Sequence, residues 1–309
     1  MVGLGPRYSS VRKIVLPISG SSCRLLPTTK TLPKEMLPLG KHPIIQHIFD
    51  EMVISNLEEF LFISSRNTNI IANHFDSNLD LVCHAEKTGG RQDSGNLDYA
   101  GCSISFFQSR HHLSSDISIP AGICTAVCSA ESFVNNEHFV VACSDTLIKS
   151  ERRPNLTHRM IDVHLKYKAA CTVGILLVPS EIYSKHGIVY PASGEDLNAE
   201  GFLLDDIVQQ PYLDRAPSRL AVSGRYVFAP EIFHEIRKLA LNNGSEFGIN
   251  DAIRGLIHSR HVVHGVRMHP DEARFVIDSH ESYYKAFIDF ARTDPECGVA
   301  IQHYITTCV

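Results

Sequence analysis

The sequence lacks an apolar run long enough to span a bilayer, a C-x-x-C pair and an excess of basic residues. The first absence excludes a transmembrane helix. The nine scattered cysteines indicate reduced thiols, and Met1–Tyr8 has no apolar core typical of a secretory signal, so we expect a cytoplasmic protein without membrane association. Acidic residues outnumber basic ones by 34 to 29, which gives no support to nucleic-acid binding. The 17 histidines form no array with metal-ligand spacing.

What is present is an alternation of short apolar runs with amphipathic segments over 309 residues. This alternation predicts an α/β fold with a mainly parallel central sheet and helices on both faces. The predicted strands are Lys13–Ile18, Phe60–Ser64, Ile104–Gln108, His138–Cys143 and Ala169–Val178. The predicted helices are Pro43–Ile54, Asn67–His74, Thr125–Phe133, Asn155–Lys168, Pro230–Leu241, Asn250–Ser259 and Ser279–Ala291. In such sheets ligands bind beyond the carboxyl ends of the strands.

The loop after the first strand carries the most informative residues, running G-S-S-C-R-L-L-P-T-T-K-T-L-P-K-E-M-L-P from Gly20 to Pro38. A turn of small residues can direct backbone N–H groups at phosphate oxygens, and Arg24 and Lys34 add cationic donors. Prolines stiffen the loop that holds these donors. The alternative is an ordinary βα loop with solvated charges, and composition alone favours this alternative.

These residues resemble the signature of sugar-1-phosphate nucleotidyltransferases, and the P-K-E-M-L-P form is similar to the bacterial UTP–glucose-1-phosphate uridylyltransferases. The likeness continues in Pro43–Gln46, Asn73–Asp76, Gly224–Val227 and Asn250–Ile253. It runs from about residue 11 to about residue 292, which implies one domain over 1–309 with a tail at 299–309. The implied fold is the Rossmann-like nucleotide-diphospho-sugar transferase domain.

The resemblance implies roles for individual residues around the nucleotide. Gly20 would pass close to the nucleotide, and Arg24 and Lys34 would be the catalytic cations. Ser22 and Cys23 stand where the family has glycine and threonine, so the loop carries side chains where backbone would approach phosphate. Further along, Gly122 corresponds to the glycine against the uracil and His111 to the family's glutamine, both as nucleotide-binding residues.

The resemblance also implies a metal site and a sugar site. Asp145 corresponds to an aspartate that binds Mg²⁺, a cation that prefers carboxylate and phosphate oxygens. The second metal aspartate falls on Val276, so that ligand is lost unless a shift of two residues brings in Asp278. The sugar-phosphate-binding residues would be Gly187, Gln209 and Gln210, with the two glutamines in place of a glutamate and a lysine.

The implied reaction joins UTP to glucose 1-phosphate and releases pyrophosphate and UDP-glucose, with in-line attack of the sugar phosphate assisted by Mg²⁺. The alternative is a catalytically impaired paralogue that binds and modulates an active subunit, because the substitutions fall on functional positions. We expect a homo-oligomer, or a hetero-oligomer with such a subunit. The apolar stretch Val299–Val309 either packs at an interface or completes the chain's own core.

Overall fold

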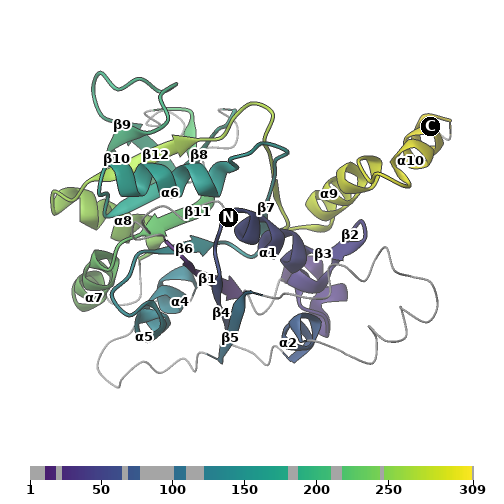
Figure 1. The fold of residues 1–309 in the computed structure, drawn as a ribbon, viewed down its shortest axis with the longest axis horizontal. Helices are drawn as coiled ribbons and strands as arrows, with labels where there is room; N and C mark the ends of the chain where they lie inside the picture. Colours follow the sequence, from purple (N-terminus) through teal and green to yellow (C-terminus); the bar gives the residue numbers. More distant parts are fainter. Residues whose placement is uncertain are drawn as a thin grey trace, which may run out of the picture.

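The computed structural model describes residues 11–18, 23–64, 69–76, 101–108, 122–179, 187–209, 218–243 and 247–307. Nine strands within these residues form one twisted sheet in the order β5-β4-β1-β6-β11-β8-β12-β10-β9 (Figure 1). These strands are β1 (Lys13–Ile18), β4 (Glu59–Ser64), β5 (Ser103–Gln108), β6 (Phe139–Ala142), β8 (Cys171–Leu177), β9 (Gly187–Pro191), β10 (Phe202–Gln209), β11 (Leu220–Phe228) and β12 (Val263–Arg267). Two small sheets pair β2 (Pro38–Leu39) with β3 (His42–Pro43) and β7 (Thr146–Lys149) with β13 (Ala273–Val276).

Helices cover both faces of the large sheet, because alternate residues of the strands enter different cores. In β1, Val15 belongs to one buried cluster, whereas Ile14 and Leu16 belong to the other. The first cluster is covered by α4 (Ile123–Ser129), α5 (Glu131–Val134), α7 (Glu231–Asn243) and α8 (Ile249–His258). The second is covered by α1 (Ile44–Ile54), α2 (Asn69–Phe75), α6 (Leu156–Lys166) and α9 (His280–Arg292). The α/β class with a central sheet between helical layers is therefore confirmed.

The sheet is mixed, which corrects the prediction of a mainly parallel sheet. Parallel pairing joins β5, β4, β1 and β6, and also β8 with β12. The long strand β11 runs antiparallel to both β6 and β8, while β10 runs antiparallel to β12 and β9. The parallel half agrees with the prediction. The antiparallel strands fall mostly in the Gly- and Pro-rich segment after Ser184, where periodicity was weak.

Most predicted elements appear within two residues of their expected bounds, and one differs in kind. The single helix predicted over Thr125–Phe133 is two short helices, because the backbone turns at Ala130, which caps the first and begins the second. Periodicity alone could not detect this break, since both pieces bury apolar residues in the same cluster.

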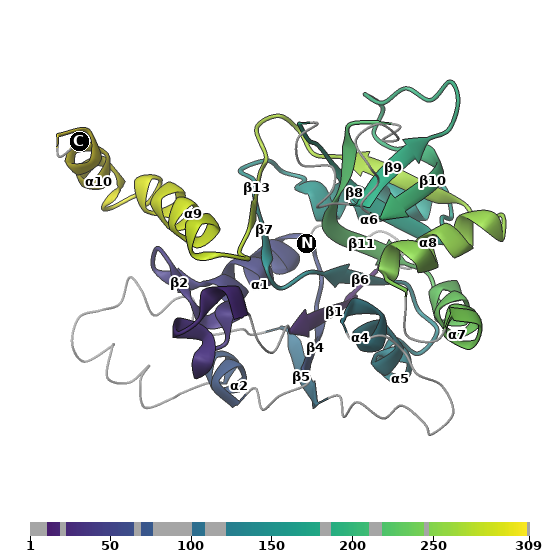
Figure 2. The same ribbon diagram turned by 180° about the vertical axis from the view of Figure 1, so that it is seen from behind.

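The C-terminal helices leave the body of the molecule as an arm (Figures 1 and 2). The base of α9 is attached through buried Ala286 and through Tyr283, whose hydroxyl donates to the carbonyl of Pro38 at 2.9 Å. The last helix, α10 (Gly298–Thr307), contacts α9 and exposes Val299 and Tyr304 by 86% and 65%. The described part of the tail therefore does not complete the chain's own core, which corrects that alternative.

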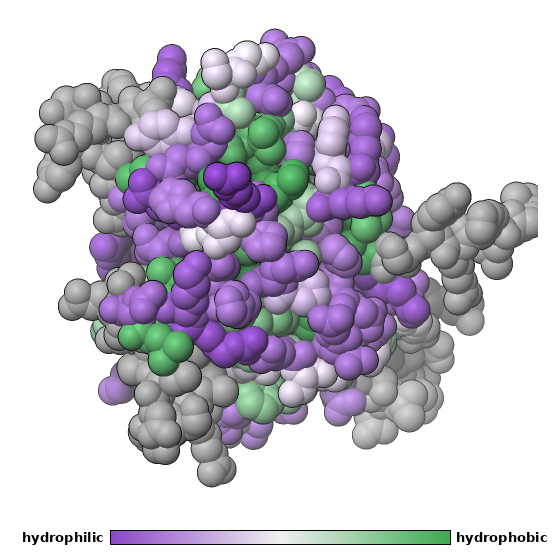
Figure 3. All heavy atoms as spheres, turned by 90° about the vertical axis from the view of Figure 1, so that its left-hand side faces the viewer, coloured by the Kyte–Doolittle hydropathy of each residue, from purple (hydrophilic) through white to green (hydrophobic). Residues whose placement is uncertain are grey.

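The side of the molecule that carries α7 and α8 has a mainly hydrophilic surface, with a group of hydrophobic residues among the polar ones (Figure 3). None of the helices in the described ranges combines the length and the apolar character needed to cross a membrane.

Candidate functional site

The carboxyl ends of β1 and β6 bring the first group of predicted residues together. Both strands are parallel neighbours in the sheet, so the loops that follow them lie at the same edge. After β6 the chain turns through Cys143 and Ser144 to Asp145. After β1 it reaches three 3₁₀ turns, at Cys23–Leu25, Thr28–Lys30 and Lys34–Met36.

Lys34 and Asp145, which are 111 positions apart, form an ion pair at this edge. The Nζ of Lys34 donates to Oδ2 of Asp145 at 2.9 Å, and Thr146 Oγ1 donates to Oδ1 at 3.1 Å. Lys34 is 7% exposed and Asp145 is 35% exposed, so the carboxylate is the accessible partner. The buried Glu35 accepts from Ser144 Oγ at 3.0 Å. Lys34 and Glu35 of the loop after β1 therefore contact Asp145 and Ser144 of the loop after β6.

A buried ion pair lies beneath this turn and fixes its backbone. Arg225 on β11 donates from Nε and Nη2 to the two carboxylate oxygens of Glu51 on α1, at 3.0 and 2.7 Å. The same Nη2 donates to the carbonyl of Thr146 at 2.8 Å. Arg225 is fully buried, and its neighbour Gly224 has a φ of 88°, a left-handed conformation that favours glycine. The segment Gly224–Val227, noted in the sequence as part of the family likeness, thus positions the Asp145 turn.

Strand β13 brings the second predicted metal position next to Asp145. Val276 pairs with Thr146, and the amide of Ile277 donates to the carbonyl of Asp145 at 2.8 Å. Asp278 accepts from Arg24 Nη1 at 3.4 Å and from the Ser282 hydroxyl at 3.1 Å. Val276 is therefore a residue without ligand atoms beside Asp145. No group of three or more metal-ligating side chains occurs in the described ranges.

The remaining carboxylate still suits a magnesium ion. Mg²⁺ is commonly held by one or two carboxylates together with substrate phosphates. Asp145 lies at a strand end, is partly exposed and has its orientation set by Lys34 and Thr146. The residues present fit a metal that is bound largely through the substrate.

Arg274 is a cation of this site that sequence reasoning missed. Its Nε is buried without a hydrogen-bond partner among the described residues, and no ion pair within those residues includes it. The pKa of the Arg274 guanidinium is lowered, chiefly by burial, while nearby Cys143, Tyr226 and Asp145 act in the opposite direction. A signal was available, because Arg274 and Val276 are alternate residues of one strand and therefore face the same side.

A second group of predicted residues gathers on β9 and β10, and it contains neutral amides. Gly187 pairs with Gln209 across the two strands. The side-chain amide of Asn250, at the start of α8, donates to Oε1 of Gln209. Asn250 is 8% exposed, and its Oδ1 has no partner among the described residues. A side chain at position 187 would collide with the Asn250 amide, so a larger residue there would displace that amide from Gln209.

Strand β11 connects the two groups. Ala221 pairs with Ile188 next to Gly187, and Arg225 pairs with Ala142 near the Asp145 turn. Four residues of strand span roughly 13 Å, a distance that one nucleotide-sugar molecule can bridge. Asn250 was noted in the sequence only as part of the likeness, without a role.

Of the predicted nucleotide-binding residues, the structure describes Cys23 and Gly122. Cys23 is exposed on the first 3₁₀ turn. Gly122 precedes α4 with a φ of 116°, in a conformation that only glycine adopts readily, and no atom would meet a side chain there. The described residues do not include Gly20, Ser22 or His111, nor do they include Gln210, which was predicted to bind the sugar phosphate.

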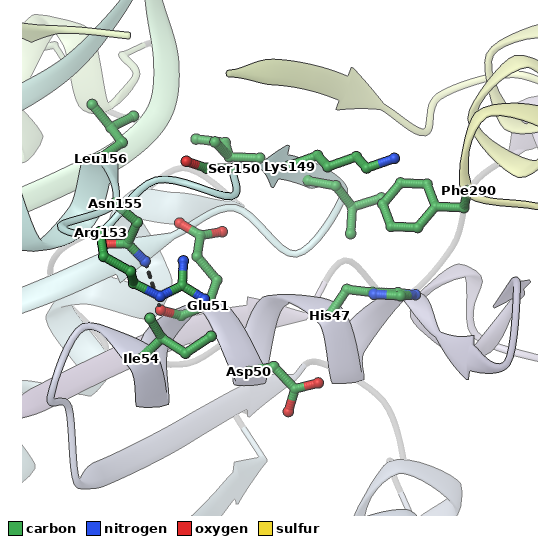
Figure 4. A pocket seen from close by; sticks show the side chains of 12 residues that line it. His47, Asp50, Glu51, Ile54, Lys149, Ser150, Arg153, Asn155, Leu156 and Phe290 are labelled. Carbon is green, nitrogen blue, oxygen red and sulfur yellow. Dashed lines mark hydrogen bonds between the residues drawn. The ribbon is translucent and has the colours of Figure 1, made fainter. Parts of the chain in front are cut away.

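A cavity of about 160 Å³ between α1, β7 and α9 contains none of the predicted residues (Figure 4). His47, Asp50 and Glu51 of α1 line one side, and Lys149 and Phe290 line the other. Burial raises the pKa of Asp50 and lowers that of His47, which favours their neutral forms. Glu51 is shared between this cavity and the buried ion pair beneath the Asp145 turn, whereas neither Lys34 nor Asp145 lines the cavity.

Comparisons with known proteins agree with this arrangement. The family model described as Nucleotidyl transferase matches residues 13–287. The chain is 32% identical over 300 residues to UTP–glucose-1-phosphate uridylyltransferase of Streptococcus pneumoniae, covering 96% of each. UTP-bound UGPase from Acinetobacter baumannii superposes with a TM-score of 0.83 at 26% identity, over 97% of this chain and all of that one. A UDP-glucose pyrophosphorylase complexed with UDP-glucose gives 0.76 at 27% identity, over 92% of this chain and all of that one.

Proposed function

Because the chain belongs to the nucleotidyl transferase family, we propose that it joins UTP to glucose 1-phosphate, releasing pyrophosphate and forming UDP-glucose. The observation that carries this proposal is the Lys34–Asp145 pair at the carboxyl ends of β1 and β6. It joins a cation and a carboxylate at the sheet edge where α/β proteins bind nucleotides. The relatives named for UTP and UDP-glucose support the choice of substrates.

In the proposed mechanism a phosphate oxygen of glucose 1-phosphate attacks the α-phosphorus of UTP in line. The new P–O bond forms as the bond from the α-phosphorus to the bridging oxygen breaks, and pyrophosphate leaves with that electron pair. Arg24 and Lys34 stabilise the negative charge on the leaving group, and fixed cations of this kind lower the barrier because they are in place beforehand. No covalent enzyme intermediate is needed.

The other proposed roles follow from the family likeness. Asp145 would hold Mg²⁺, which neutralises phosphate charge when bound. Gly20, Ser22, Cys23, Gly122 and His111 would contact the nucleotide. On the sugar side, Gln209 and Asn250 would bind hydroxyl groups beside Gly187, with Gln210 near the sugar phosphate.

The test is pyrophosphate release by the purified chain with Mg²⁺, glucose 1-phosphate and each of ATP, GTP, CTP, UTP and dTTP. We expect release with UTP above all others. Release with a different nucleotide would contradict the proposed base specificity but retain the reaction class. Silence with every nucleotide, from a folded protein, would contradict the proposal itself.

One observation favours a second candidate function. Val276 supplies no ligand atom beside Asp145, as expected of a paralogue that associates with an active subunit. In that case the chain would show no turnover alone and would change the activity of a uridylyltransferase added to it.

We further propose a single domain over residues 1–309, a cytoplasmic location and a homo-oligomer assembled through the exposed arm of α9 and α10. The support for assembly is the exposure of Tyr284, Ile288, Val299 and Tyr304 along that arm. Sedimentation of the full chain, compared with a Val299→Lys variant, tests this idea. A variant that sediments like the unmodified chain would place the interface elsewhere.

A further inference from the structure

A cavity of about 610 Å³ lies at the opposite end of the sheet from Asp145, and its volume is typical of a small-molecule site. It is bounded by residues that precede β6, β8 and β12 and by one that follows β11: His138, Ala170, Val262 and Ala229. The four residues of β6 alone separate this end from the Asp145 end by roughly 13 Å. The cavity is therefore distinct from the proposed substrate site.

Basic groups predominate in its lining. Lys168 and Arg260 contribute fixed positive charges, His138 and His261 contribute imidazoles, and Glu231 is the carboxylate in the lining. Within the described part of the chain, no ion pair involves Lys168, Arg260 or Glu231. The two cations are thus available to a ligand. Because both are positively charged, they favour an anionic ligand.

The backbone at Lys168 and Arg260 has a left-handed conformation, which glycine adopts more easily than other residues. Lys168 and Arg260 have φ values of 49° and 64°. Each follows the residue that caps a helix, α6 in one case and α8 in the other, where glycine is the usual choice. A residue with a side chain is disfavoured in this conformation, so two long cations at equivalent positions are unexpected from local stability.

Neutralising the helix dipoles does not explain these cations. A basic residue in the last turn is sufficient for that purpose, and the last turn of α6 already has Lys166, while that of α8 has His258. Lys168 and Arg260 come after these turns, and both line the cavity.

A buried hydrogen-bonded chain holds one imidazole in place at the cavity. Nδ1 of His138 contacts Nε2 of His164 at 2.8 Å, and Nδ1 of His164 contacts Thr172 Oγ1 at 3.1 Å. Burial, together with His138 and His264, lowers the pKa of His164 to about 3, so its ring is neutral at physiological pH. Among the described residues, Nε2 of His138 has no hydrogen-bond partner, which leaves it available to a ligand.

We propose that this cavity binds a phosphomonoester. Lys168 and Arg260 bind the phosphate, His138 and Glu231 bind hydroxyl or amino groups, and Leu165 with Val262 contacts the carbon skeleton. Two cations with adjacent hydrogen-bonding groups and an apolar wall suit such a ligand better than a purely apolar or a cationic one. The inference does not depend on the proposed reaction, because its test is binding.

The experiment is calorimetric titration of the full chain with AMP, with glucose 6-phosphate and with inorganic phosphate. The main variant is Lys168→Gly with Arg260→Gly, which removes both cations and places glycine where the backbone favours it. We expect this variant to unfold at the same or a higher temperature, and to bind about 100-fold more weakly, because each of the two lost charge-assisted contacts weakens binding roughly 10-fold or more.

Two further variants identify the site of any binding. Lys166→Gln with Arg152→Gln removes the same charge from exposed ion pairs elsewhere, and we expect unchanged affinity. Lys34→Gln alters the proposed substrate site, and affinity should again be unchanged. The proposal is overturned if AMP and glucose 6-phosphate both fail to bind at 10 millimolar (roughly 3 kcal/mol of binding free energy). It is also overturned if Lys34→Gln weakens binding while the glycine variant does not, since the ligand would then occupy the substrate site.

Discussion

The two halves of the proposed active site use different chemistry. Around Asp145 the contacts are ionic: Lys34 binds Asp145, Arg24 binds Asp278, and buried Arg225 supports the turn from below. Around Gln209 the contacts are neutral, between one amide and another beside a glycine. The charged half can stabilise phosphates whatever sugar is attached. The neutral half can distinguish one sugar from another only through hydrogen bonds to the sugar hydroxyl groups. In the proposed function, reaction class and sugar preference would therefore depend on separate residues.

The two halves also differ in how strongly they are held. The Asp145 turn is fixed by Glu35, by Arg225 and by the amide of Ile277. Gln209 is exposed at the end of β10, where its backbone pairs with Gly187 and its side chain accepts from Asn250, and Arg254 of α8 forms a partly exposed ion pair with Asp206 of β10. Site geometry must be accurate where charge develops in the transition state, so the heavier support on the phosphate side fits the proposed roles.

The largest expected effect comes from removing the support of the charged half. Arg225→Met leaves the buried carboxylate of Glu51 without its ionic partner and with the Thr157 hydroxyl as its remaining side-chain donor among the described residues, and breaking a buried pair in this way costs about 3–5 kcal/mol. Urea unfolding should therefore show a loss of that size. The double variant Arg225→Met with Glu51→Leu should recover much of it, because no unpaired charge remains. A single variant as stable as the unmodified chain would mean that the pair does not hold the turn.

The next effect tests the chemistry of the charged half. Lys34→Gln keeps the length of the side chain but removes the charge, and losing one preorganised donor typically lowers kcat by about 10²- to 10³-fold. The matched control is Lys285→Gln on the exposed face of α9. Pyrophosphate release over a range of UTP and glucose 1-phosphate concentrations gives kcat and KM for both variants. A raised KM with unchanged kcat in Lys34→Gln would show that Lys34 binds ground state and transition state equally.

A gain of function should follow from adding a carboxylate beside Asp145. Val276→Asp places an acid opposite Thr146, and we expect the Mg²⁺ concentration for half-maximal activity to fall about tenfold, equivalent to ~1.4 kcal/mol. Val276→Asn is the control, since it has the same shape without the charge. Equal responses from the two variants would show that position 276 does not face the metal.

Some residues of this site could be predicted from the sequence, and others could not. The bounds of β1 and the Lys34 and Asp145 positions were available from local pattern and from the family likeness. Asn250 was not assigned a role, because that role depends on its contact with Gln209 across the fold, whereas Arg274 was overlooked although it alternates with Val276 on one strand. Local periodicity reports which face of a strand is buried, but it contains no information on which distant side chain lies opposite. The break at Ala130 was missed for the related reason that both short helices keep one apolar face.

The smallest effect should come from the neutral half. Gln209→Leu removes one hydrogen-bonding amide, and a single neutral hydrogen bond contributes about 0.5–1.5 kcal/mol, which corresponds to roughly a 2- to 12-fold change. We expect the KM for glucose 1-phosphate to rise by that factor while the KM for UTP and the rate at saturation stay the same. Asp205→Asn, an exposed change in the same strand, serves as the control. A rise in the KM for UTP instead would mean that Gln209 contacts the nucleotide, and the division between a charged phosphate side and a neutral sugar side would fail.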